Sequence, residues 1–244
     1  MGRITEAVKH LILINILLFI APQFIPALGL QSLFALHFPE SPEFGVWQFA
    51  THMFMHGGFS HILFNMYGLW AFGTPLEQMW GKNKFLFFYL SAGLGAGVIY
   101  TLVNYYQFNG VYEELIKIGL SSNEIQNILN TGSYNSQILE HISEANLSDF
   151  FATYHTPAVG ASGAIYGILV AFGLSFPNSK LALIFLPVPI AAKYFIPAII
   201  LGDLFFGVTK YSIGNVAHFA HIGGALIGFI IAWYWKQNQF KRWN

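Results

Sequence analysis

The amino-acid sequence predicts an all-α membrane protein in which six transmembrane helices form a single domain over residues 1–244. Composition is the first reason: 55% of the residues are hydrophobic and only 9% are charged, whereas a soluble domain averages about a quarter charged residues. The apolar residues lie in separate runs, the longest of which reach the roughly 20 residues that a bilayer crossing needs, which is the second reason. The third is the uneven placement of basic residues along the chain.

Polar segments divide the apolar residues into six runs. We expect membrane spans at residues 11–30, 60–72, 85–106, 161–176, 194–208 and 217–235. The fourth run is shorter than the roughly 20 residues of a usual crossing, so we expect its first residue to lie below the membrane surface. Pro187 and Pro189 make a straight helix before the fifth run unfavourable. The first run resembles a signal peptide, but the spans behind it favour a retained helix.

Two segments are expected outside the bilayer. The first loop, residues 31–58, is rich in aromatic residues and amphipathic, and we expect it to lie in the membrane interface. Residues 109–156 form a polar insertion with six acidic residues and a single base, Lys117. Within it, Ser121 and Glu124 have the spacing of a capping box and predict a short helix. We expect amphipathic helices there whose apolar faces rest on the membrane surface.

Charge predicts the orientation of the spans. If both termini lie on one side, nine of the eleven basic residues fall on that side, and only Lys117 and Lys210 lie opposite. The excess indicates cytoplasmic termini, and we expect the membrane to be a bacterial inner (plasma) membrane. The insertion and the starts of spans four and six then face the outer side. A formal net charge of zero does not indicate a nucleic-acid partner, and the absence of cysteine excludes disulfides and thiol catalysis.

A tract of small residues at 157–167 carries Ser162 at the head of the fourth span. Taken alone, the tract favours close helix packing, because Gly, Ala and Ser let two backbones approach. The alternative is that Ser162 is a nucleophile within the membrane. A serine hydroxyl needs a neighbouring base for that role, and neutral histidine is the usual base near pH 7.

His221 near the start of the sixth span is the candidate base. Gly224 and Gly228 follow it on the same helical face and leave a smooth surface for another helix. If that surface packs on the fourth span at matched depth, the His221 imidazole meets the Ser162 hydroxyl, with the ring of Tyr166 one turn deeper. The alternative is a histidine that only packs helices and bonds a backbone carbonyl.

No acidic residue lies near the start of either span, so we expect a Ser-His dyad in which helix packing orients the imidazole. His218 is the alternative base, although its spacing from the glycines is worse.

Two further polar residues lie at the outer end of the second span. His61 and Asn65 are four residues apart on one helical face, and both side chains can donate hydrogen bonds. Acyl transfer needs such donors at the developing oxyanion. The backbone amides of Ser162 and Gly163, at a helix N-terminus, can add to them. The alternative is a polar pair that stabilises its own loop.

Together these motifs resemble the rhomboid intramembrane serine proteases, over about residues 8–235. The nucleophile motif corresponds to Gly160-Ala161-Ser162-Gly163, and the tyrosine stacked on the base corresponds to Tyr166. The catalytic histidine and its glycine face correspond to His221, Gly224 and Gly228, and the oxyanion pair to His61 and Asn65. Glu77 corresponds to a glutamate that braces the first loop, and Asp203-Leu204-Phe205 resembles the end of the family's fifth span.

The resemblance implies a serine endopeptidase that needs no metal or cofactor. Its partners would be transmembrane protein substrates and membrane lipid. A substrate helix would approach beside the fifth span and unwind, so that it is cut near its outer end. Two departures stand out: Trp47-Gln48 replaces the Trp-Arg of many members, and the insertion at 109–156 is longer than a minimal member needs.

Three other readings compete with this one. A metal-dependent protease would use a histidine cluster, but no His-Glu-x-x-His motif is present. A catalytically inactive rhomboid relative would bind membrane proteins, but such relatives lack the Ser-His pair. A small-molecule transporter is disfavoured because the two halves show no inverted repeat. The histidines available to a metal are His52, His56, His61, His218 and His221.

Overall fold

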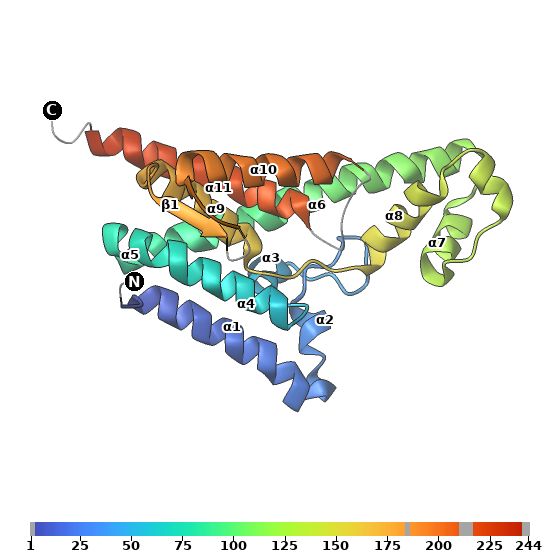
Figure 1. Cartoon of the computed structure of the whole chain (residues 1–244). Coiled ribbons are helices and arrows are strands. Elements are labelled where there is room, and N and C mark those ends of the chain that lie inside the picture. The colour runs from blue at the N-terminus through green and yellow to red at the C-terminus, as the bar shows by residue number, and fades with distance from the viewer. Residues whose placement is uncertain (1–2, 184–185, 210–216, 241–244) are drawn as a thin grey trace.

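The computed structural model describes residues 3–183, 186–209 and 217–240 as a mostly helical bundle with one small hairpin (Figure 1). α1 begins and α11 ends at the end of the molecule that carries the hairpin, and the insertion lies at the other end (Figure 1). Lys210, Lys241 and Arg242, on which the charge-based orientation partly depends, lie outside the described residues.

Within the described residues, three helices are long and apolar enough to cross a membrane by length and composition. They are α1 (Glu6–Phe24), α6 (Lys82–Lys117) and α11 (His218–Phe240). α9 (Ser162–Ser175) is the shorter apolar helix that the sequence predicted, and nine of its fourteen residues are buried. α9 therefore forms the centre of the bundle, whereas α10 (Ala192–Val208) lies at its periphery with three buried residues.

The second apolar run forms a longer helix than predicted. It consists of α4 (Phe59–Gly68), the π-helical turn η3 (Leu69–Gly73) and α5 (Thr74–Trp80). The helix passes the expected end at residue 72, and Pro75 lies just after the π-helical turn, in the first turn of α5.

The segment before the fifth run is a β-hairpin, in agreement with the expectation that no straight helix forms there. β1 (Lys180–Leu183) pairs antiparallel with β2 (Leu186–Ala191), and Lys180 faces Ala191. Pro187 and Pro189 both lie in β2. They are tolerated because a two-stranded sheet leaves each strand one unpaired edge.

The insertion has a hydrophobic core of its own. α6 continues to Lys117, beyond the predicted end at residue 106, and α7 (Ser122–Thr131), η4 (Ser136–Glu140) and α8 (Glu144–His155) follow. Buried side chains from these helices surround Phe108, whose ring stacks on Phe150 at 4.2 Å between centroids. The apolar faces thus pack against one another, which corrects the expectation that they rest on the membrane.

The predicted capping box is present at the start of α7. The Ser121 hydroxyl accepts from the Glu124 N–H, and the Glu124 carboxylate accepts from the Ser121 N–H at 2.8 Å. These hydrogen bonds lower the pKa of the Glu124 carboxyl.

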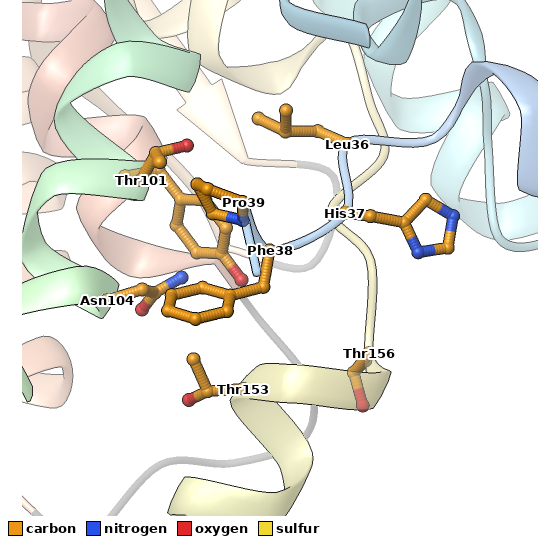
Figure 2. Close-up of a pocket in the computed structure, with 9 residues that line it drawn as sticks. Leu36, His37, Phe38, Pro39, Thr101, Asn104, Thr153 and Thr156 are labelled. Carbon is orange, nitrogen blue, oxygen red and sulfur yellow. The ribbon is translucent and has the colours of Figure 1, made fainter. Parts of the chain in front are cut away.

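Between α1 and α4 the chain forms η1 (Pro26–Leu28), α2 (Leu30–Phe34), α3 (Gln48–Thr51) and η2 (His52–Phe54), and all of these except η1 lie mainly in the first loop. Its residues Leu36 to Pro39 meet Thr101 and Asn104 of α6 and Thr153 of α8 around a small cavity (Figure 2). Phe38 also enters the core of the insertion. The insertion is therefore a support for the first loop.

Gln48, which departs from the arginine of many rhomboids, is fully buried within this loop. Its amide donates to the Glu43 carbonyl at 2.8 Å and its oxygen accepts from the His37 N–H at 3.1 Å. Trp47 donates from its ring to the Leu33 carbonyl at 2.9 Å. A neutral side chain thus braces the loop through its backbone, which leaves no unpaired charge to bury.

Candidate active site

The structure places Ser162 directly beside His221. Ser162 is the first residue of α9, and His221 lies in the first turn of α11. The Nε2 atom of His221 and the Oγ atom of Ser162 are 2.8 Å apart, which is hydrogen-bonding distance. A base on this atom can take the hydroxyl proton as the oxygen attacks a carbonyl carbon.

Small residues set this distance by letting α9 and α11 touch through their backbones, with α6 packed closely against α9. A Cβ atom added to Gly224 would lie 1.8 Å from the Gly163 carbonyl oxygen, and one added to Gly228 would lie 2.5 Å from the Gly167 Cα. A Cβ on Gly163 would also meet the Ala96 side chain of α6 at 2.5 Å. The tract around Ser162 therefore packs helices, and the packing is what brings the two side chains together.

The ring of Tyr166 packs on one face of the His221 ring. The two rings stack with their centroids 4.2 Å apart and their planes 10° from parallel. The stacking restrains rotation of the imidazole, because turning the ring would drive it into the tyrosine.

An acidic residue also contacts the imidazole, which overturns the expectation that none lies near. Asp203 of α10 is 8% exposed, and its Oδ1 atom is 3.2 Å from His221 Nδ1 and 2.5 Å from His218 Nδ1. Tyr166 donates its hydroxyl to the other carboxylate oxygen. The imidazole that reaches Ser162 is that of His221, whereas Nδ1 of His218 faces Asp203.

The residue pattern at the starts of spans four and six does not indicate Asp203, because this residue lies on span five. Asp203 precedes His221 by eighteen residues and lies on a different helix, so only the packing of α10 on α9 and α11 brings it near. The sequence does indicate Asp203 in another way. A carboxyl group within an apolar span, such as residues 194–208, is costly and marks a candidate for a functional site.

Across the tract from His221 lies His61 of α4. Gly160 has φ +129°, which favours glycine, and a Cβ there would lie 2.8 Å from His61 Nε2 and 3.5 Å from Ser162 Oγ. The space next to this glycine is thus bordered by both atoms. His61 Nδ1 accepts from the Gly57 N–H at 3.4 Å, which leaves Nε2 as the protonated nitrogen.

The other two expected oxyanion donors differ in their surroundings. Asn65 is buried, and its amide donates to the His61 carbonyl within α4 at 3.0 Å. Gly163 lies ahead of the first backbone hydrogen bond of α9, which runs from Ile165 to the Ala161 carbonyl. Its N–H belongs to the unpaired first turn of the helix, as the sequence indicated.

Backbone hydrogen bonds attach the first loop to the tract before Ser162. Leu36 and Ala158 exchange two bonds of 2.9 and 2.8 Å, and the Gly160 N–H donates to the His52 carbonyl at 3.0 Å. His52 is itself fixed by a 2.9 Å bond from its ring to the Gln48 carbonyl. The first loop and the nucleophile tract therefore form one connected unit.

Comparison with known proteins places this arrangement in a family. The family model described as the rhomboid domain matches residues 43–123 and 130–238. The chain belongs to the rhomboid family.

Its relatives include mitochondrial and bacterial proteins. The chain is 31% identical over 182 residues to the mitochondrial presenilin-associated rhomboid-like protein of Rattus norvegicus, covering 74% of this chain and 35% of that protein. It is 28% identical over 187 residues to rhomboid protease GluP of Bacillus subtilis, covering 76% and 25%. The match to mitochondrial rhomboid protein 1 of Saccharomyces cerevisiae is 26% over 181 residues, covering 74% and 39%.

Two conclusions follow from these coverages and sources. The chain spans between a quarter and two fifths of the length of these curated relatives. The apolar helices indicate an integral membrane protein, but the expected bacterial inner membrane has no support from relatives that include mitochondrial rhomboids.

Glu77 has a different place in this rhomboid from the expected one. Its two carboxylate oxygens accept hydrogen bonds from the N–H groups of Ala7 at 2.8 Å and Val8 at 2.9 Å. Glu77 therefore caps the start of α1 instead of bracing the first loop. The reason is its position on α5, at the opposite end of the α4–α5 helix from the residues that contact the loop.

The five histidines named for a metal site do not form one cluster. Among the residues that the structure describes, the group with metal-ligand spacing is Asp203, His218 and His221, whose donor atoms lie within 4.8 Å of one another. In this group both Nδ1 atoms face the carboxylate, and Nε2 of His221 faces Ser162. The geometry is that of hydrogen bonds between these side chains.

Proposed function

We propose that the chain is an intramembrane serine endopeptidase that cleaves transmembrane segments of other membrane proteins. The observation that carries the proposal is the 2.8 Å contact between His221 Nε2 and Ser162 Oγ, at the head of a buried apolar helix. A nucleophile and a general base at hydrogen-bonding distance are the two groups that acyl transfer by a serine requires.

The reaction would proceed in two halves. In the first, His221 takes the Ser162 proton as Oγ attacks the peptide carbonyl, and then protonates the leaving amine. In the second, His221 activates water, which releases the acyl group and restores the hydroxyl. The carbonyl oxygen would enter the space beside Gly160, where His61 Nε2–H and the amides of Ser162 and Gly163 are the nearest candidate donors. We assign Asn65 to the same group as a further donor.

The proposal includes six membrane crossings, with the termini cytoplasmic and the insertion outside. In it α4–α5, α9 and α10 supply the crossings beyond the three long apolar helices. The substrate helix would approach beside α10, whose side chains Tyr194, Leu201 and Phe205 are 66%, 63% and 54% exposed. Such a peripheral helix with an apolar outer surface suits contact with lipid and with another transmembrane helix.

The decisive experiment compares wild type with Ser162→Ala in liposomes, against a panel of model transmembrane substrates. Ser175→Ala is the matched control, because it removes a hydroxyl from the other end of the same helix. We expect cleavage and fluorophosphonate labelling by wild type and Ser175→Ala, and neither by Ser162→Ala.

Two outcomes would overturn the proposal. If wild type neither cleaves nor labels, the chain would be an inactive rhomboid that binds membrane proteins. If Ser162→Ala keeps full activity and a chelator abolishes it, the enzyme would depend on a metal.

A further inference from the structure

α10 contributes one ionisable side chain to the interior of the bundle. Of its seventeen residues only Ala192, Ile196 and Asp203 are buried, so Asp203 is the one polar group among them. A buried carboxylate is costly unless hydrogen bonds replace the water it has lost. The hydrogen-bond partners of Asp203 therefore indicate what this buried carboxylate does.

Three donors from two other helices surround this carboxylate. His218 and His221 of α11 direct Nδ1 to the same oxygen, at 2.5 and 3.2 Å. Tyr166 of α9 donates its hydroxyl to the second oxygen. Both oxygens are thus engaged, and α10 is joined to the two helices that carry the nucleophile and the base.

The contact with His221 determines which ring nitrogen carries the proton. A carboxylate can only accept, so Nδ1 of His221 must be the donor in this bond. In the neutral ring the other nitrogen, Nε2, then presents a lone pair, and that nitrogen is 2.8 Å from Ser162 Oγ. This is the tautomer that a base needs in order to take the serine proton.

We propose that Asp203 is a positioning residue, which fixes the tautomer and orientation of His221 and stabilises the imidazolium formed when Ser162 loses its proton. The inference rests on the proposed serine mechanism. His218 and Tyr166 also contribute indirectly, because both hold the Asp203 carboxylate in place. The catalytic unit is then a Ser-His pair with an acid supplied by a third helix.

The first test is Asp203→Asn, with Asp149→Asn as the control because Asp149 is an exposed acid on α8. Replacing the acid of a serine triad by its amide lowers kcat on the order of 10⁴-fold. Since Tyr166 stacking still restrains the ring here, we expect a fall of roughly 10²- to 10⁴-fold in kcat. KM for a transmembrane substrate should stay within about threefold, because Asp203 acts on the base and not on substrate binding.

A double-mutant cycle separates positioning from a general loss of structure. His218→Ala should lower kcat less than Asp203→Asn does, and should cause no further loss in the Asp203→Asn background. Additive losses would mean that His218 acts independently of the carboxylate, which would contradict its assigned role.

If Asp203→Asn fails to fold, the protonation of His221 can be measured by NMR in the wild-type protein instead. In protein labelled with ¹⁵N-histidine, the signals absent from His221→Ala identify His221. We expect them to show a protonated Nδ1 and an unprotonated Nε2, and the opposite tautomer would overturn the inference.

Failure of this inference is distinguishable from failure of the proposed function. If wild type is active, Ser162→Ala is inactive and Asp203→Asn keeps kcat within threefold of wild type, only the role of Asp203 is wrong. If wild type is inactive or Ser162→Ala is active, the serine mechanism itself is wrong.

Discussion

Gly224→Ala tests whether contact between the backbones of α9 and α11 places the base. The new Cβ would lie 1.8 Å from the Gly163 carbonyl oxygen and 2.6 Å from its carbon. Both are backbone atoms, so no side-chain rotation relieves the clash. Because non-bonded atoms need about 3.4 Å or more, the helices must separate by roughly 1.6 Å at this level.

The separation has a calculable effect on the site. Gly224 is one turn from His221, so the 2.8 Å contact of His221 with Ser162 would lengthen beyond the 3.5 Å at which a hydrogen bond is lost. A misplacement of about 1 Å costs on the order of 10²-fold in rate. Overpacking a tight interface costs about 1–3 kcal/mol of stability.

The assay is kcat for a model transmembrane substrate in liposomes, together with Tm in detergent. Gly202→Ala is the matched control, since a Cβ on this helical glycine of α10 meets nothing within 4 Å. We expect Gly202→Ala to resemble wild type. If Gly224→Ala keeps kcat within twofold and its Tm is unchanged, close backbone contact does not set the position of His221.

Three further predictions follow from the contacts described. Glu77→Gln leaves one of two buried N–H groups at the start of α1 without an acceptor, so the free energy of unfolding should fall by about 1–3 kcal/mol, seen as a lower Tm with kcat unchanged. Tyr166→Phe keeps the ring stacked on His221 but removes the hydroxyl from Asp203, and we expect kcat to fall less than about tenfold, whereas Tyr166→Ala should lose much more. Burial, with neighbouring His61, lowers the pKa of His56 in the first loop to about 4. Between about pH 6.5 and 4 only the unfolded chain binds this proton. The free energy of unfolding should therefore be highest above pH 6.5 and should fall by up to about 3 kcal/mol as the pH is lowered to 4. A His56→Asn variant should show a flatter dependence of Tm on pH, and an equal slope would contradict the assignment.

Periodicity within single helices predicted the central pair of the site. The spacing of His221, Gly224 and Gly228 identifies one face, and Ser162 and Tyr166 identify another. Since charge placed the starts of both spans on one side, the two faces could meet at matched depth, with His221 favoured over His218 by its spacing from the glycines. Nothing beyond local spacing and the direction of each span was needed.

Contacts that depend on a third element were not predictable in this way. Asp203 reaches His221 through the packing of α10, and Glu77 reaches Ala7 because α1 starts beside α5. The capping-box spacing of Ser121 and Glu124 predicted the start of α7, but the apolar residues of the insertion did not show what their faces pack against. Spacing shows which face of a helix is apolar, whereas its partner is set by tertiary structure.

The same contacts that hold the bundle together also form the candidate site. In a bilayer the hydrophobic effect gives little drive for helix association, so close backbone packing and interhelical hydrogen bonds must supply it. Here α9 and α11 meet through Gly163 and Gly224, and Asp203 bonds α10 to both. Because a shift of one ångström ends the Ser162–His221 hydrogen bond but costs only part of the packing energy, variants at these contacts should lose activity before they lose the fold.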